Sequence, residues 1–192
     1  MAPQRKKVKV KLRKQKKKWF NVLASPEFKE QIIGETMAFE SENLIGRSVR
    51  VNLSLVSREV RRQGKFVTFR IKEVKDATAH TELIKYEIPS MHVKRLVRKE
   101  RDKVDDSFLV ETKDGIKLRV KPLILTRDHT QNSVKTSLRK AVNDLLKKEA
   151  KEKTYSEFVL ALLSMSLQKT IKSSLKTVYP LSLAEIRVMQ KL

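Results

Sequence analysis

Few residues of this chain could act on a small molecule or hold a metal ion. The three histidines, His80, His92 and His129, lack the short spacings that bring ligands to one metal, and the sequence contains no cysteine. No serine stands in the nucleophile motif of hydrolases, and the four glycines are spaced too widely for a phosphate-binding loop. We therefore expect no metal, no cofactor, no small-molecule substrate and no enzymatic activity.

One pair of neighbouring acids, Asp105 and Asp106, resembles half of a carboxylate metal site. A solvated acidic pair at the start of a strand is the simpler interpretation. An RNA-cleaving or RNA-modifying enzyme that uses Asp105, Asp106 or His129 stays open as an alternative. Turnover measurements on alanine variants at these three positions would decide it.

The chemistry that the sequence does offer is that of cations. Lys and Arg total 44 against 22 Asp and Glu, which gives a formal net charge of +22 over 192 residues. Such a charge repels itself unless a polyanion lies nearby, so nucleic acid is the expected partner. No apolar run approaches the roughly 18 residues of a membrane-spanning helix, and no signal peptide opens the chain. We expect a cytoplasmic protein with no membrane partner.

The first 18 residues form the densest cluster, with ten lysines and arginines and no acid. This segment lacks the apolar residues that would stabilise a fold, and its like charges repel each other. We therefore expect a disordered basic arm over residues 1–18. Its candidate RNA contacts are Arg5, Lys6, Lys7, Lys9, Lys11, Arg13, Lys14, Lys16, Lys17 and Lys18.

Two further cationic clusters lie in the rest of the chain. The stretch 92–101 would gather Lys94, Arg98 and Arg101 on one side of a short helix. In the stretch 127–140, polar residues lead into a helix N-terminus, whose free amides favour phosphate. A solvated helix face and a plain N-cap are the simpler alternatives. The candidate RNA contacts in the two stretches are Lys94, Arg95, Arg98, Arg101, Arg127, Lys135, Arg139 and Lys140.

Residues 19–126 are dominated by an alternation of apolar and polar positions, which is typical of half-buried strands. The alternating stretches are Val49–Leu55, Val67–Ile71, Ile84–Ile88 and Ile116–Val120. Asp114-Gly115 predicts a tight hairpin between the run 104–112 and the run 116–125. Several strands joined by short turns favour an antiparallel barrel, because closure removes exposed sheet edges.

From about residue 133 the apolar spacing becomes that of a helix, with Leu138, Val142 and Leu146 on one face. Thr154-Tyr155-Ser156-Glu157 predicts a capping box at the start of a second helix, which carries Phe158, Val159, Leu162 and Met165 inward. That helix either continues to about Lys172 or is followed by another. Residues 181–190 alternate like a strand that returns to the sheet.

We therefore predict an α+β fold with a basic arm over residues 1–18 and a single RNA-binding domain over residues 19–192. The domain has an antiparallel β-barrel-like body, with strands over about 19–126, and C-terminal helices over about 133–178. Nothing in it resembles a base-reading helix or an exposed aromatic platform, so recognition should rest on phosphate and shape. Trp19 and Phe20 could stack on RNA bases, but burial in the barrel is the favoured interpretation.

Several short motifs run along the whole chain in a specific order. They are Lys17-Lys18-Trp19-Phe20, Ile33-Gly34 with Thr36, Gly46-Arg47, Asp114-Gly115 with Leu118-Arg119, Lys135-Thr136-Ser137 and Tyr179-Pro180-Leu181. Their order and spacing resemble the small-subunit ribosomal protein family shared by archaea and eukaryotes, called S-three-a or eukaryotic-type S-one. The chain stops at Leu192, without the C-terminal extension of eukaryotic members, so the archaeal form is the closer likeness.

This resemblance implies a non-enzymatic, ribosome-bound protein on the platform of the small subunit, near the messenger exit. It implies ribosomal RNA and neighbouring platform proteins as partners, with messenger RNA as a further candidate near the exit. It adds Arg47 and Thr136 to the expected RNA contacts, although Arg47 could equally be a barrel-rim residue. A DNA-binding chromatin protein is the alternative that charge alone permits, and competition between duplex DNA and ribosomal RNA would separate the two.

Overall fold

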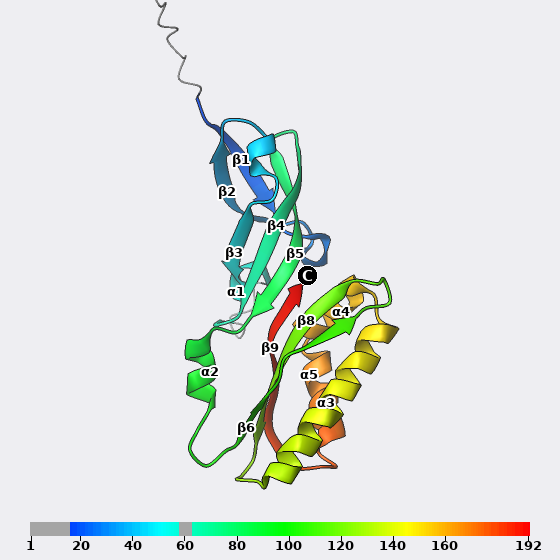
Figure 1. Ribbon diagram of the computed structural model, residues 1–192. Coiled ribbons are helices and arrows are strands. Elements are labelled where there is room, and N and C mark those ends of the chain that lie inside the picture. The colour runs from blue at the N-terminus through cyan, green and yellow to red at the C-terminus, as the bar shows by residue number, and fades with distance from the viewer. Residues whose placement is uncertain (1–15, 58–62) are drawn as a thin grey trace, which may run out of the picture.

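A computed structural model describes residues 16–57 and 63–192 as an α+β fold with one large sheet (Figure 1). The strands are β1 (Lys18–Leu23), β2 (Ile32–Ala38), β3 (Ser48–Asn52), β4 (Phe66–Lys75), β5 (Thr78–Glu87), β6 (Lys103–Asp105), β7 (Phe108–Glu111), β8 (Lys117–Thr126) and β9 (Leu181–Lys191). The helices are α1 (Leu53–Ser57), α2 (Ser90–Leu96), α3 (Asn132–Glu152), α4 (Tyr155–Leu163) and α5 (Ser166–Leu175), with short 3-10 turns η1 (Pro26–Phe28) and η2 (Glu42–Leu44). The predicted α+β class, with helices after most of the strands, is confirmed.

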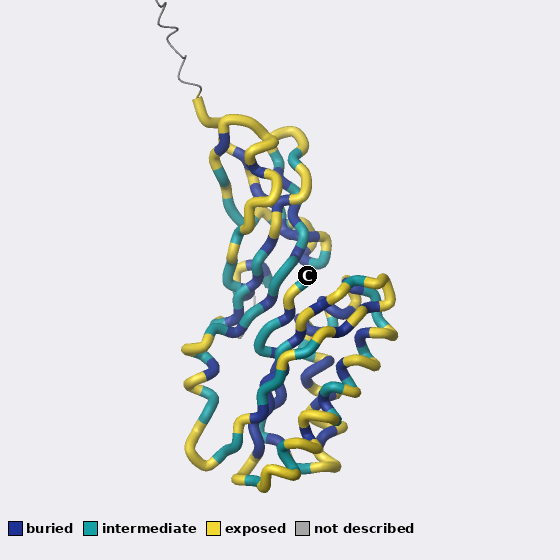
Figure 2. The backbone as a smooth tube through the Cα atoms, viewed as in Figure 1, coloured by how far each residue is buried: buried dark blue, intermediate teal, exposed yellow. Residues whose placement is uncertain are grey.

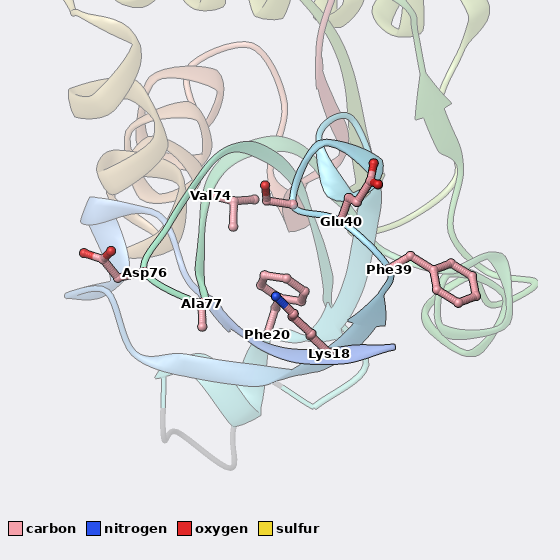
Figure 3. A pocket seen from close by; sticks show the side chains of 8 residues that line it. Lys18, Phe20, Phe39, Glu40, Val74, Asp76 and Ala77 are labelled. Carbon is pink, nitrogen blue, oxygen red and sulfur yellow. The ribbon is translucent and has the colours of Figure 1, made fainter. Parts of the chain in front are cut away.

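The N-terminal half of the sheet curls on itself. β1 pairs with β5 in parallel orientation. The other pairs are antiparallel: β1 with β2, β4 with β5, and β3 with β4. Figure 3 looks into this curl, with Phe20 pointing inward, where it packs in a small core with Val22, Leu44 and Ile71. β2 and β3 do not pair with each other within the described residues. The barrel-like body is therefore a curled sheet that stays open.

The last strand joins the two halves of the molecule. β9 pairs with β5 through Lys85–Glu87 and with β8 along almost its whole length. The strand that was predicted to return to the sheet therefore lies in its middle (Figure 1). α3, α4 and α5 cover one face of the C-terminal half, and the buried positions concentrate where these helices meet the sheet (Figure 2).

The C-terminal helices follow their sequence signals closely. Leu138, Val142 and Leu146 of α3 are buried, as the apolar stripe predicts. α4 begins at the predicted capping box, in which Thr154 and Glu157 each accept from the other's backbone amide. α4 ends at Leu163 and α5 follows as a separate helix, with Met165 between them at a φ of 65°. Of the two alternatives left open by the sequence, the structure thus shows two helices, and Met165, predicted to face inward, is only half-buried.

The structure corrects the prediction for Ile84. β5 pairs Lys85 with Thr68 but Leu83 with Phe69, so Ile84 is the extra residue of a β-bulge. A bulge shifts the alternation by one position. The inward residues of β5 are therefore Leu83 and Tyr86, both buried, while Ile84 is only partly buried.

A second correction concerns the stretch Val49–Leu55, which was predicted to be one strand. β3 ends at Asn52, whose side-chain oxygen accepts from the Ser54 amide at 3.0 Å. This local hydrogen bond competes with the strand ladder and starts α1 at Leu53. Leu53 stays buried, but Leu55 is 73% exposed.

The run 104–112 also forms two strands where one was expected. β6 pairs with Leu123–Leu125 of β8 and β7 pairs with Lys117–Val120, which leaves a break opposite Lys121 and Pro122. Proline has no amide hydrogen to give to a ladder, and the pairing of β8 with β9 is also irregular here, with Arg187 of β9 as the extra residue of a bulge. The predicted hairpin itself is confirmed, with Gly115 at a φ of 73° and the Gly115 amide bonded to the Thr112 carbonyl at 2.9 Å.

Candidate nucleic-acid interface

The lysines and arginines divide into those that pair with acids and those that do not. The paired cations are Arg50, Lys65, Lys75, Lys85, Lys103, Lys135, Lys153 and Lys191. Within residues 16–57 and 63–192, most of the predicted RNA contacts of the body form no ion pair. These unpaired candidates are Arg47, Lys94, Arg95, Arg98, Arg101, Arg127, Arg139 and Lys140. Their charge is thus available to an external anion.

The first cluster of the body is presented by a loop rather than by one helix face. α2 ends at Leu96, and Val97 is extended with φ −77° and ψ 127°. Lys94 and Arg95 are exposed in the last turn of α2, where cations also stabilise the negative end of a helix. Arg98 and Arg101 lie beyond the helix, so the predicted single row of Lys94, Arg98 and Arg101 is wrong.

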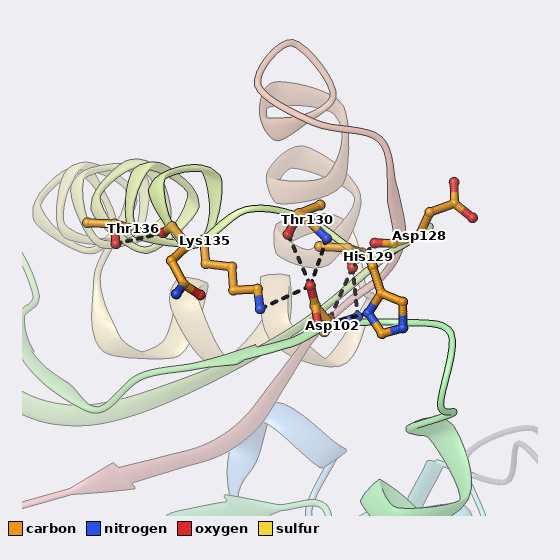
Figure 4. Close-up of polar contacts among 8 residues, drawn as sticks. Asp102, Asp128, His129, Thr130, Lys135 and Thr136 are labelled. Carbon is orange, nitrogen blue, oxygen red and sulfur yellow. Dashed lines mark hydrogen bonds and ion pairs between the residues drawn. The ribbon is translucent and has the colours of Figure 1, made fainter.

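The start of α3 is held by an acid of the chain itself (Figure 4). The Asp102 carboxylate accepts from the Thr130 amide at 2.8 Å and lies 3.0 Å from the Lys135 ammonium and 3.3 Å from Nδ1 of His129. The Thr130 amide and the Lys135 ammonium hold the pKa of Asp102 well below its usual range. Lys135, expected on phosphate, therefore already has an acid partner within the protein.

Farther along α3, the surface is strongly basic. Thr136 donates its hydroxyl to the Asn132 carbonyl at 3.0 Å, so the predicted RNA contact there is already engaged within the helix. Arg139 and Lys140 are exposed. Lys147, Lys148 and Lys151 extend the basic surface toward the end of the helix, and Asp144 interrupts it. These three lysines were not among the predicted RNA contacts, although helical spacing places Lys140, Lys147 and Lys151 on one side.

The face of the sheet opposite the helices carries cations that sequence reasoning missed entirely. Adjacent strands pair these residues one after another. From β8 to β3, the row consists of Arg119, Gln190, Lys85, Thr68 and Arg50, each directly opposite the next. Directly opposed residues point to the same side of a sheet, so this row crosses five strands on one face. Only the strand register reveals it, because its members are far apart in the sequence.

Ion pairing weakens part of this row. Arg50 and Lys85 both form ion pairs with Glu87, and Nη2 of Arg50 lies 2.6 Å from Oε1 of Glu87. These neighbours lower the pKa of Glu87 against the opposing effect of its burial, so the acid stays ionised between them. Arg119 has no acid partner in the described part of the chain and keeps its full charge.

The arm joins the fold at its curled end. Its candidate contacts Arg5, Lys6, Lys7, Lys9, Lys11, Arg13 and Lys14 lie outside the described residues, whereas Lys16, Lys17 and Lys18 are described and exposed. Lys18 is already the first residue of β1. Arg47 lies in the turn before β3, exposed, and donates from Nη1 to the Met37 carbonyl at 3.1 Å.

The structure separates the two neighbouring aromatics of β1. Phe20 is buried in the curl, as predicted, with 6% of its surface exposed. Trp19 is 61% exposed, so its predicted burial is wrong. Successive residues of a strand point to opposite faces, and only one of the two could enter the core.

The acids that might have formed a catalytic site do not converge. Asp105 pairs with Lys103 at 2.7 Å, and Asp106 accepts from the Ser107 amide at 2.8 Å. Both line a depression of about 300 Å³, to which His129 does not contribute. The described residues contain no group of three or more side chains placed to hold a metal ion.

A second cavity, of about 430 Å³, opens at the end of the curl (Figure 3). Lys18 and Phe20 line it together with the acids Glu40 and Asp76. Two carboxylates make it a poor cradle for phosphate. No helix in the described ranges is long and apolar enough to cross a membrane.

Comparisons with known proteins agree with one another over nearly the whole chain. Residues 4–192 match the model of the Ribosomal S3Ae family. The chain is 33% identical over 174 residues to the small ribosomal subunit protein eS1 of Halorubrum lacusprofundi, an alignment that covers 91% of this chain and 81% of that protein.

Two further relatives carry the same name. The eS1 protein of Saccharolobus islandicus is 32% identical over 170 residues, which cover 88% of this chain and 82% of that protein. The eS1 protein of Nanoarchaeum equitans is 30% identical over 165 residues, with coverage of 86% and 83%. The similarity therefore includes both the curled half and the helical half of the molecule.

Proposed function

Since the chain belongs to the ribosomal S3Ae family, we propose that it is a structural constituent of the small ribosomal subunit that binds ribosomal RNA through phosphate and shape. The family is a structural component of the ribosome and not an enzyme, in agreement with the expectation from the sequence. The named relatives give the alternative of a DNA-binding chromatin protein no support.

The observation that carries the proposal of RNA binding is the set of unpaired cations. They lie on α2 and the loop after it, on α3, on the outer face of β8 and beside the arm. Several separate anchor points of this kind fit a large folded polyanion better than a small ligand, because one small anion could reach only one of them. Contacts to phosphate would fix the position of the protein without reading bases.

The family likeness supports a finer proposal for the location. We place the protein on the platform of the small subunit near the messenger exit, with ribosomal RNA and other platform proteins as neighbours. Messenger RNA is a candidate contact at the exit. In the cell the protein would be ribosome-bound in the cytoplasm.

Sedimentation of ribosomes through solutions of increasing salt tests the proposal. Phosphate contacts made through a folded surface should keep the protein on small subunits at salt concentrations that remove a loosely adsorbed polycation. A free polylysine of similar charge is the control. Release of the protein together with polylysine would contradict a structural role.

A competition experiment separates RNA from DNA. The full chain is bound to labelled small-subunit ribosomal RNA and challenged with unlabelled duplex DNA or with the same RNA, at one fixed salt concentration. We expect the folded RNA to compete far better than the duplex. Equal competition by DNA would favour the chromatin alternative.

A further inference from the structure

Trp19 occupies an unusual position for the largest apolar side chain of a protein. It lies on the outer face of β1, 61% exposed, while its neighbour Phe20 fills the curl. Tryptophan buries a large area when it finds a partner, and a contiguous apolar patch left in water usually marks a binding surface. The fold therefore offers Trp19 to something outside the described chain.

The surroundings of Trp19 form an apolar patch. Met37 of β2 lies directly across from Trp19 and is 45% exposed. Phe39, two residues after Met37, is also 45% exposed. In Figure 3 its ring points away from the curl. We call Trp19, Met37 and Phe39 the aromatic patch. A thioether beside an indole gives a polarisable surface of the kind on which flat rings pack well.

Cations border this aromatic patch on two sides. Lys17 places its ammonium 5.4 Å from the centre of the Phe39 ring. Arg47 is anchored by one nitrogen to the Met37 carbonyl, 3.1 Å away, and its guanidinium has further N–H groups for another acceptor. Lys16 continues the positive charge toward the arm, whereas Lys18 lies on the opposite face of β1 and lines the cavity with Phe20. Two acids lie nearby, Glu35 of β2 and Glu40 next to Phe39, and both would direct phosphates toward Arg47 and the lysines.

We propose that Trp19 stacks on an unpaired base of the ribosomal RNA, with Arg47 and the lysines at the end of the arm holding the flanking phosphates. Proteins bind single-stranded nucleic acid by combining an aromatic platform for the base with cations for the backbone. The aromatic patch supplies the platform, and the residues around it supply the cations. This inference rests on the proposed binding of ribosomal RNA and names a point at which a base is contacted.

A protein partner is the competing explanation for an exposed aromatic surface. The charge beside the patch favours RNA, because residues 1–18 hold ten cations and no acid. A protein surface would have to supply matching acids over this entire segment. A contact with a ribosomal protein is one of the outcomes that Trp19 fluorescence can reveal.

Tryptophan fluorescence gives a direct test, because Trp19 is the only tryptophan of the chain. The full-length protein is titrated with purified small-subunit ribosomal RNA, and in parallel with RNA-free ribosomal proteins of the same subunit. Stacking on a base should strongly quench the Trp19 emission in the RNA titration. An unchanged emission in a demonstrably formed RNA complex, or a change that only the proteins produce, would overturn the proposal.

Variants supply an independent measurement by filter binding. Trp19→Ala should weaken RNA binding by about 5- to 100-fold, the range for losing one stacked base, and Trp19→Phe should recover part of the loss. The dependence of affinity on salt should stay as in the wild type, because stacking involves no counterion release. Leu55→Ala, at another exposed apolar residue, should leave the affinity unchanged.

The outcomes also separate this inference from the proposed function. If Trp19→Ala binds ribosomal RNA as tightly as the wild type, stacking is refuted while RNA binding stands. If the wild type itself shows no preference for ribosomal RNA, both ideas fail together. Quenching in the wild type needs no substitution, so the test holds even if a variant folds poorly.

Discussion

The Asp102 carboxylate and the Lys135 ammonium lie 3.0 Å apart and tie the loop before β6 to the first turn of α3. Asp102 also accepts from the Thr130 amide, so one acid orders the segment that leads into the helix. Lys135, a predicted RNA contact, thus also has a structural role within the protein. The cations available to phosphate begin farther along α3, at Arg139 and Lys140.

Replacing Asp102 by asparagine should loosen the start of α3. The amide side chain keeps its shape but loses the charge that attracts Lys135 and strengthens the bond to Thr130. We expect faster hydrogen exchange at the Thr130 amide and nearby, with exchange in the core of α3 unchanged. Asp106→Asn, next to Ser107, is the matched control. Equal exchange rates in the wild type and Asp102→Asn would contradict this role.

The same carboxylate predicts a specific dependence of stability on pH. The pKa of Asp102 is lower in the folded state than in the unfolded chain, where it is about 4. Its stabilising effect is therefore complete above that unfolded value and is lost as the pH falls through the folded one. Urea unfolding should show a difference between the wild type and Asp102→Asn that is present at neutral pH and shrinks below about pH 4. A difference that grew as the pH fell below about 4 would have the wrong sign.

Lys65 and Glu185 form the most buried ion pair of the described residues, with Nζ of Lys65 3.2 Å from a Glu185 oxygen and 3.3 Å from Sδ of Met165. Either Lys65→Met or Glu185→Leu alone leaves an uncompensated buried charge and should cost about 3 to 5 kcal/mol in the free energy of unfolding. The double variant should lose much less, since neither charge remains. Unfolding of all three variants in urea measures the effect, and additive losses would refute the coupling.

Signals between neighbours in the sequence predicted local structure well. The capping box of Thr154 and Glu157, the Asp114-Gly115 hairpin and the apolar stripe of α3 all form as expected. Each depends on hydrogen bonds or side-chain spacings within a few residues, and the sequence displays those completely. The α+β class followed from the same local patterns.

Features that depend on distant residues could not be predicted in this way. The bulge at Ile84 and the outward position of Trp19 are set by strand register and by which aromatic the curl can accommodate. The engagement of Lys135 by Asp102 joins two segments that only the fold brings together. Charge counting identified cations but could not say which of them an internal acid had already neutralised.

The capping box should contribute measurably to stability. Thr154→Ala removes the oxygen that accepts from the Glu157 amide and should cost about 1 kcal/mol in the free energy of unfolding. Thr154→Ser keeps that oxygen and serves as the control. Thermal or urea unfolding measures both, and equal losses in the two variants would show that the hydroxyl is not the stabilising group.

The position of a cation should matter more for RNA binding than the total charge. Arg139→Gln combined with Lys140→Gln removes two unpaired charges of α3, whereas Lys75→Gln with Lys103→Gln removes two that already pair with acids. The Arg139/Lys140 double variant should lower the slope of log affinity against log salt by about 0.7 to 0.9 for each lost phosphate contact. The Lys75/Lys103 double variant should change this slope little. Equal slopes would mean that only net charge counts.

Binding of ribosomal RNA should hardly change between about pH 6 and 8, because lysine and arginine stay charged throughout that range. The titratable residue next to the α3 cluster is His129, and its Nδ1 lies 3.3 Å from Asp102 rather than toward an external ligand. Affinity measured at constant ionic strength across this range tests the expectation. A steep loss of affinity on raising the pH would mean that a protonated histidine contacts the RNA, and His92→Gln and His129→Gln would show which one.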